Sequence, residues 1–170
     1  LYSSIFDPNP VIFLEHRWLH NSFGKFPEKL NKNELGKCQI LKKGRDVTLI
    51  GLSYMTLECI EASKILKEFK IDAEIIDLKT VSPLDKKTII SSVKKTKRAL
   101  VTDTSNSFCG ISSTVASIIY QNISNLNNKV EIVSLPFCPE PTSYQLVKHF
   151  YNDRYTIVNK VLKMFKIKKT

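Results

Sequence analysis

Residues 46–76 read DVTLIGLSYMTLECIEASKILKEFKIDAEII, and this stretch decides the fold. It begins with an apolar run at 46–52 that lacks polar alternation, which is typical of a strand covered on both faces. Ser53 then stands where a helix cap is expected, and the apolar residues beyond it share a helical spacing. These residues are Met55, Cys59, Ala62, Leu66 and Phe69. A second apolar run at 73–76 predicts the next strand, so the stretch predicts two parallel strands joined by a right-handed helical crossover.

The same alternation of strands and helices continues on both sides of this stretch. A short strand is expected before it, at 37–41. After it, Ser82 is expected to cap a helix that begins with Pro83, carries Asp85 in its first turn and ends near residue 95. The remaining elements are a strand at 99–102, a helix at 112–121, a strand at 130–135, and helices at 144–151 and 155–165. Alternation of this kind predicts an α/β fold with parallel strands and helices on both faces of the sheet.

Length and composition indicate one globular domain. The chain has 170 residues, and 42% of them are hydrophobic, which is enough to form a core. No apolar run approaches the ~18 residues of a membrane span, and no secretion signal is recognisable at the start, so no membrane association is expected. Cys38, Cys59, Cys109 and Cys138 are far apart in the sequence, which disfavours a zinc site and predicts buried free thiols. We therefore expect a cytoplasmic protein without a structural metal.

The net charge is +10, because 26 Lys and Arg outnumber 16 Asp and Glu. Basic residues gather from Lys160 to the end of the chain and in one internal cluster, which consists of Lys94, Lys95, Lys97 and Arg98. One interpretation is a surface that binds an anionic partner such as nucleic acid. The other is a solvated surface, which is favoured because the apolar residues within 155–165 have the spacing of an amphipathic helix with a lysine face. No specific nucleic-acid partner is expected.

Candidate ligand-binding residues lie where the expected strands end, since doubly wound sheets bind ligands beyond the carboxyl ends of their strands. The most polar of these ends is Asp103 to Asn106, followed by Ser107. It could hold a small polar ligand, or it could form the turn and cap that lead into the next helix, which is the favoured interpretation. His16 and His20, on either side of Arg17 and Trp18, could bind an anion or pack at an interface, and packing is favoured.

The sequence motifs that usually carry catalysis are missing. The five glycines form neither a GxGxxG pattern nor a phosphate-binding Walker loop, and no serine stands in a GxSxG elbow. We therefore assign no catalytic residue, no cofactor-binding residue and no metal ligand to this chain.

Three segments carry a resemblance to a known family: PVIFLEHRWLH at 10–20, GRDVTLIGLSYM at 44–55 and IDLKTVSPLDKKTIISSVKKTKR at 76–98. The helix expected after Gly110 and the turn Pro139-Glu140-Pro141 extend it. Together these segments resemble the C-terminal half of a beta subunit from thiamine diphosphate-dependent 2-oxo acid dehydrogenases, in the first component of the pyruvate dehydrogenase type. The resemblance covers nearly the whole chain.

This resemblance implies a fold and a division into domains. The fold is that of the transketolase C-terminal domain: three layers, α/β/α, around a sheet of about five strands that is parallel except for one antiparallel edge strand. Residues 1–16 would end an upstream pyrimidine-binding domain, with 11–15 as its last strand. Residues 17–35 would be a linker, residues 36–167 the C-terminal domain and residues 168–170 a basic tail.

The resemblance also implies a function in assembly. The C-terminal domain would form a homodimer, an alpha subunit would complete the heterotetramer, and the parent enzyme would oxidatively decarboxylate pyruvate or a related 2-oxo acid. Thiamine diphosphate and magnesium are implied for the parent complex and not for this chain, and Glu15 does not inherit the catalytic glutamate's role. Two alternatives stay open: a non-enzymatic module that binds an anionic partner through lysine-rich surfaces, and a self-contained small-molecule enzyme around Asp103.

The chain departs from the family pattern near the expected strand ends. Thr104 and Thr114 each stand where the family has Glu, and Phe137 stands where it has Asp. Five lysines among the last eleven residues also disfavour docking of the basic domain through which the family's core partner binds. The departures point to a stand-alone or specialised enzyme rather than a member of a giant complex.

Overall fold

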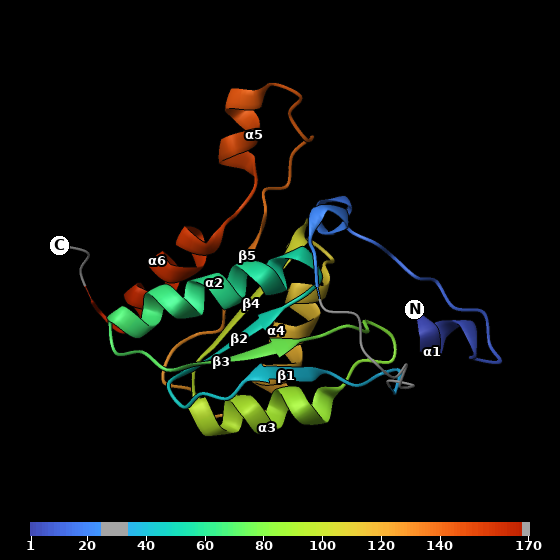
Figure 1. Cartoon of the computed structure of the whole chain (residues 1–170). Coiled ribbons are helices and arrows are strands. Elements are labelled where there is room, and N and C mark those ends of the chain that lie inside the picture. Colours follow the sequence, from blue (N-terminus) through green and yellow to red (C-terminus); the bar gives the residue numbers. More distant parts are fainter. Residues whose placement is uncertain (25–33, 168–170) are drawn as a thin grey trace.

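The computed structural model describes residues 1–24 and 34–167 (Figure 1). Residues 25–33 of the expected linker, and the expected basic tail at 168–170, lie outside the described residues. Among the residues that are described, no helix is long and apolar enough to cross a membrane.

A five-stranded sheet forms the centre of the molecule, in the order β1-β3-β2-β4-β5. Its strands are β1 (Gln39–Lys42), β2 (Val47–Gly51), β3 (Ala73–Asp77), β4 (Ala99–Asn106) and β5 (Glu131–Leu135). The strand pairs β2–β3, β2–β4 and β4–β5 are parallel, and only β1 runs antiparallel to its neighbour β3, at the edge. The predicted fold class, a mostly parallel sheet with one antiparallel edge strand, is confirmed.

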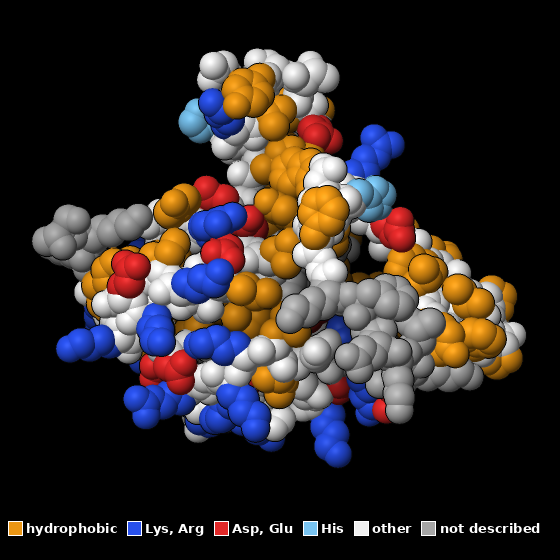
Figure 2. All heavy atoms as spheres, in the orientation of Figure 1, with side chains coloured by type: hydrophobic (Ala, Val, Ile, Leu, Met, Phe, Trp, Pro, Cys, Tyr) orange, Lys and Arg blue, Asp and Glu red, His pale blue; other side chains and the backbone are white. Residues whose placement is uncertain are grey.

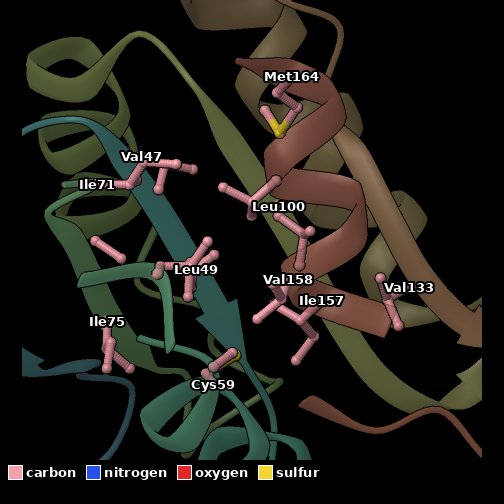
Figure 3. Close-up of a cluster of buried hydrophobic side chains, with 14 of the residues drawn as sticks. Val47, Leu49, Cys59, Ile71, Ile75, Leu100, Val133, Ile157, Val158 and Met164 are labelled. Atoms are coloured by element: carbon pink, nitrogen blue, oxygen red, sulfur yellow. The ribbon is translucent and has the colours of Figure 1, made fainter. Parts of the chain in front are cut away.

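Helices cover both faces of this sheet. On one face lie α2 (Tyr54–Glu68) and α6 (Arg154–Met164), and on the other lie α3 (Lys86–Thr96) and α4 (Ile111–Asn122). Because successive strand residues point to opposite faces, each strand contributes to two cores. Leu49 and Leu100 pack under α2 and α6, as Figure 3 shows, whereas their neighbours Ile50 and Val101 pack under α3 and α4.

Two helix starts differ from the prediction. Helix α3 begins after Asp85, whose Oδ1 accepts a hydrogen bond from the backbone N–H of Thr88 at 3.1 Å, so Asp85 and not Ser82 is the cap. Aspartate caps at least as well as serine, and Thr88 stands at the position that such a cap reaches. Ser53 does precede α2, but its side chain makes no capping hydrogen bond. Its φ of 54° departs from the extended backbone that capping residues normally adopt.

The N-terminal segment lies outside the three layers. It contains a short helix, α1 (Tyr2–Ile5), and a 3-10 turn, η1 (Arg17–Asn21), and Figure 1 shows α1 and the chain after it extending away from the sheet. Residues 11–15 pair with no strand among the described residues, and Ile12 and Leu14 are 87% and 84% exposed. A strand forms only where a partner strand supplies hydrogen bonds, and the expected partner belongs to the upstream domain, so the strand at 11–15 stays a prediction.

Candidate functional site

The carboxyl ends of β2, β3, β4 and β5 all lie at one edge of the sheet, which we call the carboxyl edge. It is formed by the residues that follow each strand: 52–53 after β2, 78–85 after β3, 107–110 after β4 and 136–143 after β5. The last of these segments leads into α5 (Tyr144–Phe150), which stands away from the sheet in Figure 1. The candidate segment Asp103 to Asn106 forms the last residues of β4 and leads directly into this edge.

Asp103 is buried at this edge, with 2% of its surface exposed, and its carboxylate is occupied by its own chain. Oδ1 accepts hydrogen bonds from the backbone N–H and the hydroxyl of Ser105 at 3.0 and 2.9 Å. Oδ2 accepts a hydrogen bond from the backbone N–H of Ser112, in the first turn of α4, at 3.1 Å. The structure thus supports the cap interpretation of Asp103 over the ligand interpretation.

The chain after Asp103 follows β4 further than predicted. The strand runs to Asn106 instead of ending at residue 102, and its register against β5 shifts between Thr102 and Asn106. The turn into α4 requires Gly110, because a Cβ atom there would lie 2.2 Å from the backbone oxygen of Asn106. The polar segment is therefore an irregular end of a strand and not an open loop.

Asp77, at the end of β3, is likewise held by its own chain. The hydroxyl of Thr56 in α2 donates a hydrogen bond to Asp77 Oδ1 at 3.3 Å. Burial raises the pKa of the Asp77 carboxyl, and the nearby charge of Lys79 opposes that shift. This contact fixes the start of α2 over the end of β3.

Aromatic rings cover the start of α2. The His16 ring stacks on Tyr54 at 5.3 Å, and Trp18 contacts both Tyr54 and Tyr151 with ring centroids 4.9 and 4.8 Å away. Nδ1 of His16 accepts a hydrogen bond from the backbone N–H of Trp18 at 3.3 Å, and burial lowers the pKa of His16. A stacked imidazole whose pKa is lowered is a poor anion ligand, so the packing interpretation of His16 is supported. His20 instead lies exposed, with its Nε2 3.3 Å from Oε2 of Glu15.

An ion pair that the sequence analysis missed lies beside these rings. Glu58 of α2 has a side chain that is only 4% exposed, and it accepts hydrogen bonds from Nε and Nη2 of Arg154 at 3.0 and 3.1 Å. The Tyr54 hydroxyl also donates to Glu58, at 2.9 Å. The sequence does contain a sign of this pair, because Glu58 falls on the same helical face as the apolar residues Met55 and Ala62. A carboxylate on such a face requires a buried partner. This pair joins α2 to α6.

The basic cluster is largely paired within the chain. Lys95 forms an ion pair with the buried carboxylate of Glu74, and Lys97 donates to the side-chain oxygen of Asn125 at 2.9 Å. The Arg98 guanidinium lies 4.4 Å from the centre of the Phe165 ring and donates to Asn128 at 3.1 Å. The predicted amphipathic helix near the C-terminus is confirmed, since α6 buries its apolar residues against the sheet. These contacts favour a structural surface over an anion-binding site.

The prediction of buried thiols is wrong for two of the four cysteines. Cys59 is buried and Cys38 is half-buried, but Cys109 and Cys138 are exposed. The apolar stretches beside these two end with β4 and β5, so the cysteines fall in the connections beyond the core. His149 is exposed on α5.

Exposed apolar side chains include those of the N-terminal segment, of the connections after β4 and β5, and of α5 (Figure 2). Phe108 and Phe137 form a ring pair, with centroids 5.3 Å apart, although they are 68% and 77% exposed. Tyr144 and Leu146 of α5 are 71% and 60% exposed. An exposed apolar ring pair of this kind is typical of a surface that contacts another molecule.

The donor groups at the carboxyl edge do not fit thiamine diphosphate and magnesium. Magnesium needs free carboxylate oxygens, yet the Asp103 and Asp77 carboxylates already accept hydrogen bonds from neighbouring residues. In the described part of the chain, no three His, Cys, Asp or Glu side chains are grouped so that they could hold a metal ion. We therefore derive no reaction step from this edge.

Fold and edge together define a doubly wound α/β/α domain with one antiparallel edge strand and strand-end carboxylates that bind its own helices. A sequence profile of the transketolase C-terminal domain matches residues 36–157. The chain belongs to that family.

Curated relatives extend the similarity beyond this domain. The chain is 37% identical to the pyruvate dehydrogenase E1 component subunit beta of Rickettsia bellii, over 99% of this chain and 52% of that protein. It is 35% identical to the beta subunit of the acetoin:2,6-dichlorophenolindophenol oxidoreductase of Cupriavidus necator, over 84% of this chain and 43% of that protein. The chain thus spans about half the length of these relatives.

A solved structure shares the fold. It is described as a split-gene transketolase in an inactive beta4 tetramer, and it superposes with a TM-score of 0.68 at 24% identity. The match covers 84% of this chain and 48% of that one. At this identity, the likeness supports the fold alone.

Proposed function

We propose that this chain is the assembly domain of the beta subunit of a thiamine diphosphate-dependent 2-oxo acid dehydrogenase, and that it pairs with a second copy as a two-fold dimer. Two kinds of beta subunit, from a pyruvate dehydrogenase and from an acetoin oxidoreductase, align with most of the chain and support the subunit assignment. An alpha subunit is the second proposed partner. The parent enzyme would oxidise pyruvate or a related 2-oxo acid in the cytoplasm, with its cofactors held outside this chain.

The proposal keeps the expected division of the chain. Residues 1–16 would end a pyrimidine-binding domain, residues 17–35 would link it to the C-terminal domain, and that domain would run from residue 36 to residue 167. The exposure of the apolar residues at 11–14 supports this division, because such residues are normally covered by a neighbouring domain or subunit.

The main support for the assembly role is the apolar surface that lies outside the two cores. Phe23 is fully exposed, Trp18 is 43% exposed, and the exposed side chains of Phe137 and Leu146 lie on the carboxyl edge and on α5, respectively. A two-fold contact that buries a standard ~1,600 Å² would remove such residues from water, and two-fold symmetry is the commonest oligomer symmetry. The net charge of +10 opposes self-association, but salt screens that repulsion.

Sedimentation velocity tests the dimer at ~0.15 M salt and tens of micromolar protein, where charges are screened beyond about 8 Å. We expect a dimer for the unmodified chain and dissociation toward monomer for Leu146→Ser in α5. Leu57→Ser is the matched control, since Leu57 is an exposed leucine of α2, at 38%, on the body of the domain. A purely monomeric chain, or equal dissociation by both variants, would count against the proposal.

No observation favours the lysine-rich surface as a second function. Lys95 and Lys97 already bind groups of their own chain, as does Lys160, whose Nζ lies 3.1 Å from Glu131 Oε2. An anionic partner would have to compete with these contacts.

A further inference from the structure

Cys109 and Cys138 occupy equivalent places at the ends of two neighbouring parallel strands. Asn106 of β4 and Leu135 of β5 are register partners, so their backbones lie at the usual strand spacing of about 4.8 Å. Cys109 stands three residues after Asn106, and Cys138 stands three residues after Leu135. The two connections therefore leave the sheet side by side.

Local contacts hold the residues around the two cysteines close to the ends of β4 and β5. Phe108 and Phe137, the residues just before them, bring their ring centroids to 5.3 Å. Both backbones also turn tightly: the N–H of Gly110 donates to the Ser107 oxygen at 3.4 Å, and the N–H of Cys138 donates to the Pro136 oxygen at 2.9 Å. A disulfide needs Cα atoms within roughly 4.4–6.8 Å, and the Phe108–Phe137 contact shows that the residues preceding the two cysteines lie within side-chain reach of each other.

Both thiols are open to reagents in solution, unlike the other two cysteines. Cys109 and Cys138 are exposed, and Cys109 also lines an open groove of about 490 Å³ beside the first turns of α4. Burial, reinforced by Asp85 and Asp77, raises the pKa of Cys38 to about 12. Burial also raises the pKa of Cys59. The thiolate is the reactive form, so these two thiols are poor nucleophiles at neutral pH.

We propose that Cys109 and Cys138 form a reversible intramolecular disulfide by exchange with a low-molecular-weight disulfide such as glutathione disulfide. One cysteine thiolate attacks a sulfur of glutathione disulfide, which gives a protein–glutathione mixed disulfide and releases one glutathione thiolate. The second cysteine thiolate then attacks the protein sulfur of that bond and displaces the second glutathione. Two cysteine thiols are oxidised, one glutathione disulfide is reduced to two thiols, and the two protons go to solvent or to the released thiolates.

The bond would tie the turn before α4 to the connection that carries α5. These are the segments that present Phe108 and Phe137, so oxidation would hold the exposed ring pair in one arrangement. In a reducing compartment the dithiol is the resting form, and the bridge would form when the thiol–disulfide balance shifts.

The test uses the reduced 170-residue chain, exposed to glutathione disulfide and then quenched with acid and N-ethylmaleimide. Mass spectrometry of the intact chain should show the loss of two hydrogens and no retained glutathione, and unreduced peptide maps should contain a Cys109–Cys138 cross-link. Dithiothreitol should reverse both changes. A neighbouring thiol has an effective concentration of about 1 mM or more. At about 0.1 mM free glutathione, the internal disulfide should therefore be about ten times as abundant as the mixed disulfide.

Single variants identify the two partners. In Cys109→Ser, Cys138 should retain one glutathione, and in Cys138→Ser, Cys109 should retain one. Cys38→Ser is the matched control and should form the bridge as the unmodified chain does. Predominant glutathione adducts on both exposed cysteines of the unmodified chain would overturn the proposal, and so would a disulfide-linked dimer in place of the internal bridge.

Discussion

Replacing Arg154 by methionine should lower the free energy of unfolding by about 2–3 kcal/mol. Methionine keeps the apolar stem of the side chain against α2 but removes the guanidinium. The Glu58 carboxylate, 4% exposed, then loses its hydrogen bonds from Nε and Nη2. It keeps only the backbone N–H of Arg154, at 2.8 Å, and the Tyr54 hydroxyl, at 2.9 Å.

The magnitude follows from the burial of the two partners. Breaking a fully buried ion pair costs about 3–5 kcal/mol, whereas exposed pairs contribute about 0–1 kcal/mol. The Glu58 side chain is buried, but the Arg154 side chain is 38% exposed, so water partly replaces the lost donors. An intermediate cost of about 2–3 kcal/mol corresponds to a fall in melting temperature of roughly 4–12 °C for a domain of this size.

Urea denaturation followed by far-ultraviolet circular dichroism measures this loss. Lys64→Met is the matched control, because Lys64 pairs with Glu61 at 2.6 Å on the same helix but its side chain is 66% exposed. The control should cost about 0–0.5 kcal/mol. Adding Glu58→Gln to Arg154→Met should recover part of the loss, since the uncompensated charge disappears. If Arg154→Met costs no more than the control, the ion pair does not hold α2 to α6 and the reasoning fails.

The remaining predictions concern pH, cofactor and nucleic acid. Burial opposes ionisation of Glu74, but hydrogen bonds from Lys95, Ser92 and the Gly44 N–H outweigh it and hold the pKa of the carboxyl below its ordinary 4.5. The stability that the ionised Glu74 contributes is present above pH 4.5 and is lost as pH falls through its lowered pKa. On acidification, the urea midpoint of Glu74→Gln should therefore fall less steeply than that of the unmodified chain. Calorimetric titration with thiamine diphosphate and magnesium should detect no stoichiometric micromolar binding to this chain. Nucleic acid should bind only weakly and with a steep salt dependence, and binding that is tight at ~0.15 M salt and abolished by Lys94→Glu with Lys97→Glu would contradict this.

The architecture could be predicted because burial on both faces leaves a strong pattern in the sequence. The strand residues Leu49, Ile50, Leu100 and Val101 form continuous apolar runs, since neighbours in each pair serve opposite cores. Four of the five strands were therefore predicted within two residues of their observed bounds, and the exception is β4. The cap of α3 was misplaced by a few residues because Ser82 and Asp85 both have capping side chains, and only the backbone decides between them.

Features that depend on contacts between distant residues could not be predicted in this way. The apolar run at 11–15 has the composition of a strand, but hydrogen-bond partners decide whether a strand forms, and composition does not supply them. The pairing of Glu58 with Arg154 joins residues that lie far apart in the sequence, so only an unexplained charge on an apolar helix face was visible. The exposure of Cys109 and Cys138 depends on where β4 and β5 end, and β4 ends four residues later than predicted.

The contacts at the carboxyl edge support the proposed assembly role over ligand binding. In doubly wound sheets the connections at the point where strand order reverses present free polar groups to a ligand. Here strand order reverses between β2 and β4, and the groups at that point are occupied: Asp103 binds the start of α4, and Tyr54 is covered by Trp18. At this edge the carboxylates of Asp77 and Asp103 bind their own chain, whereas the rings of Phe108 and Phe137 are exposed to water. Shape and apolar area, rather than hydrogen-bond donors, are thus what the edge offers, and a protein surface is the partner that can use them.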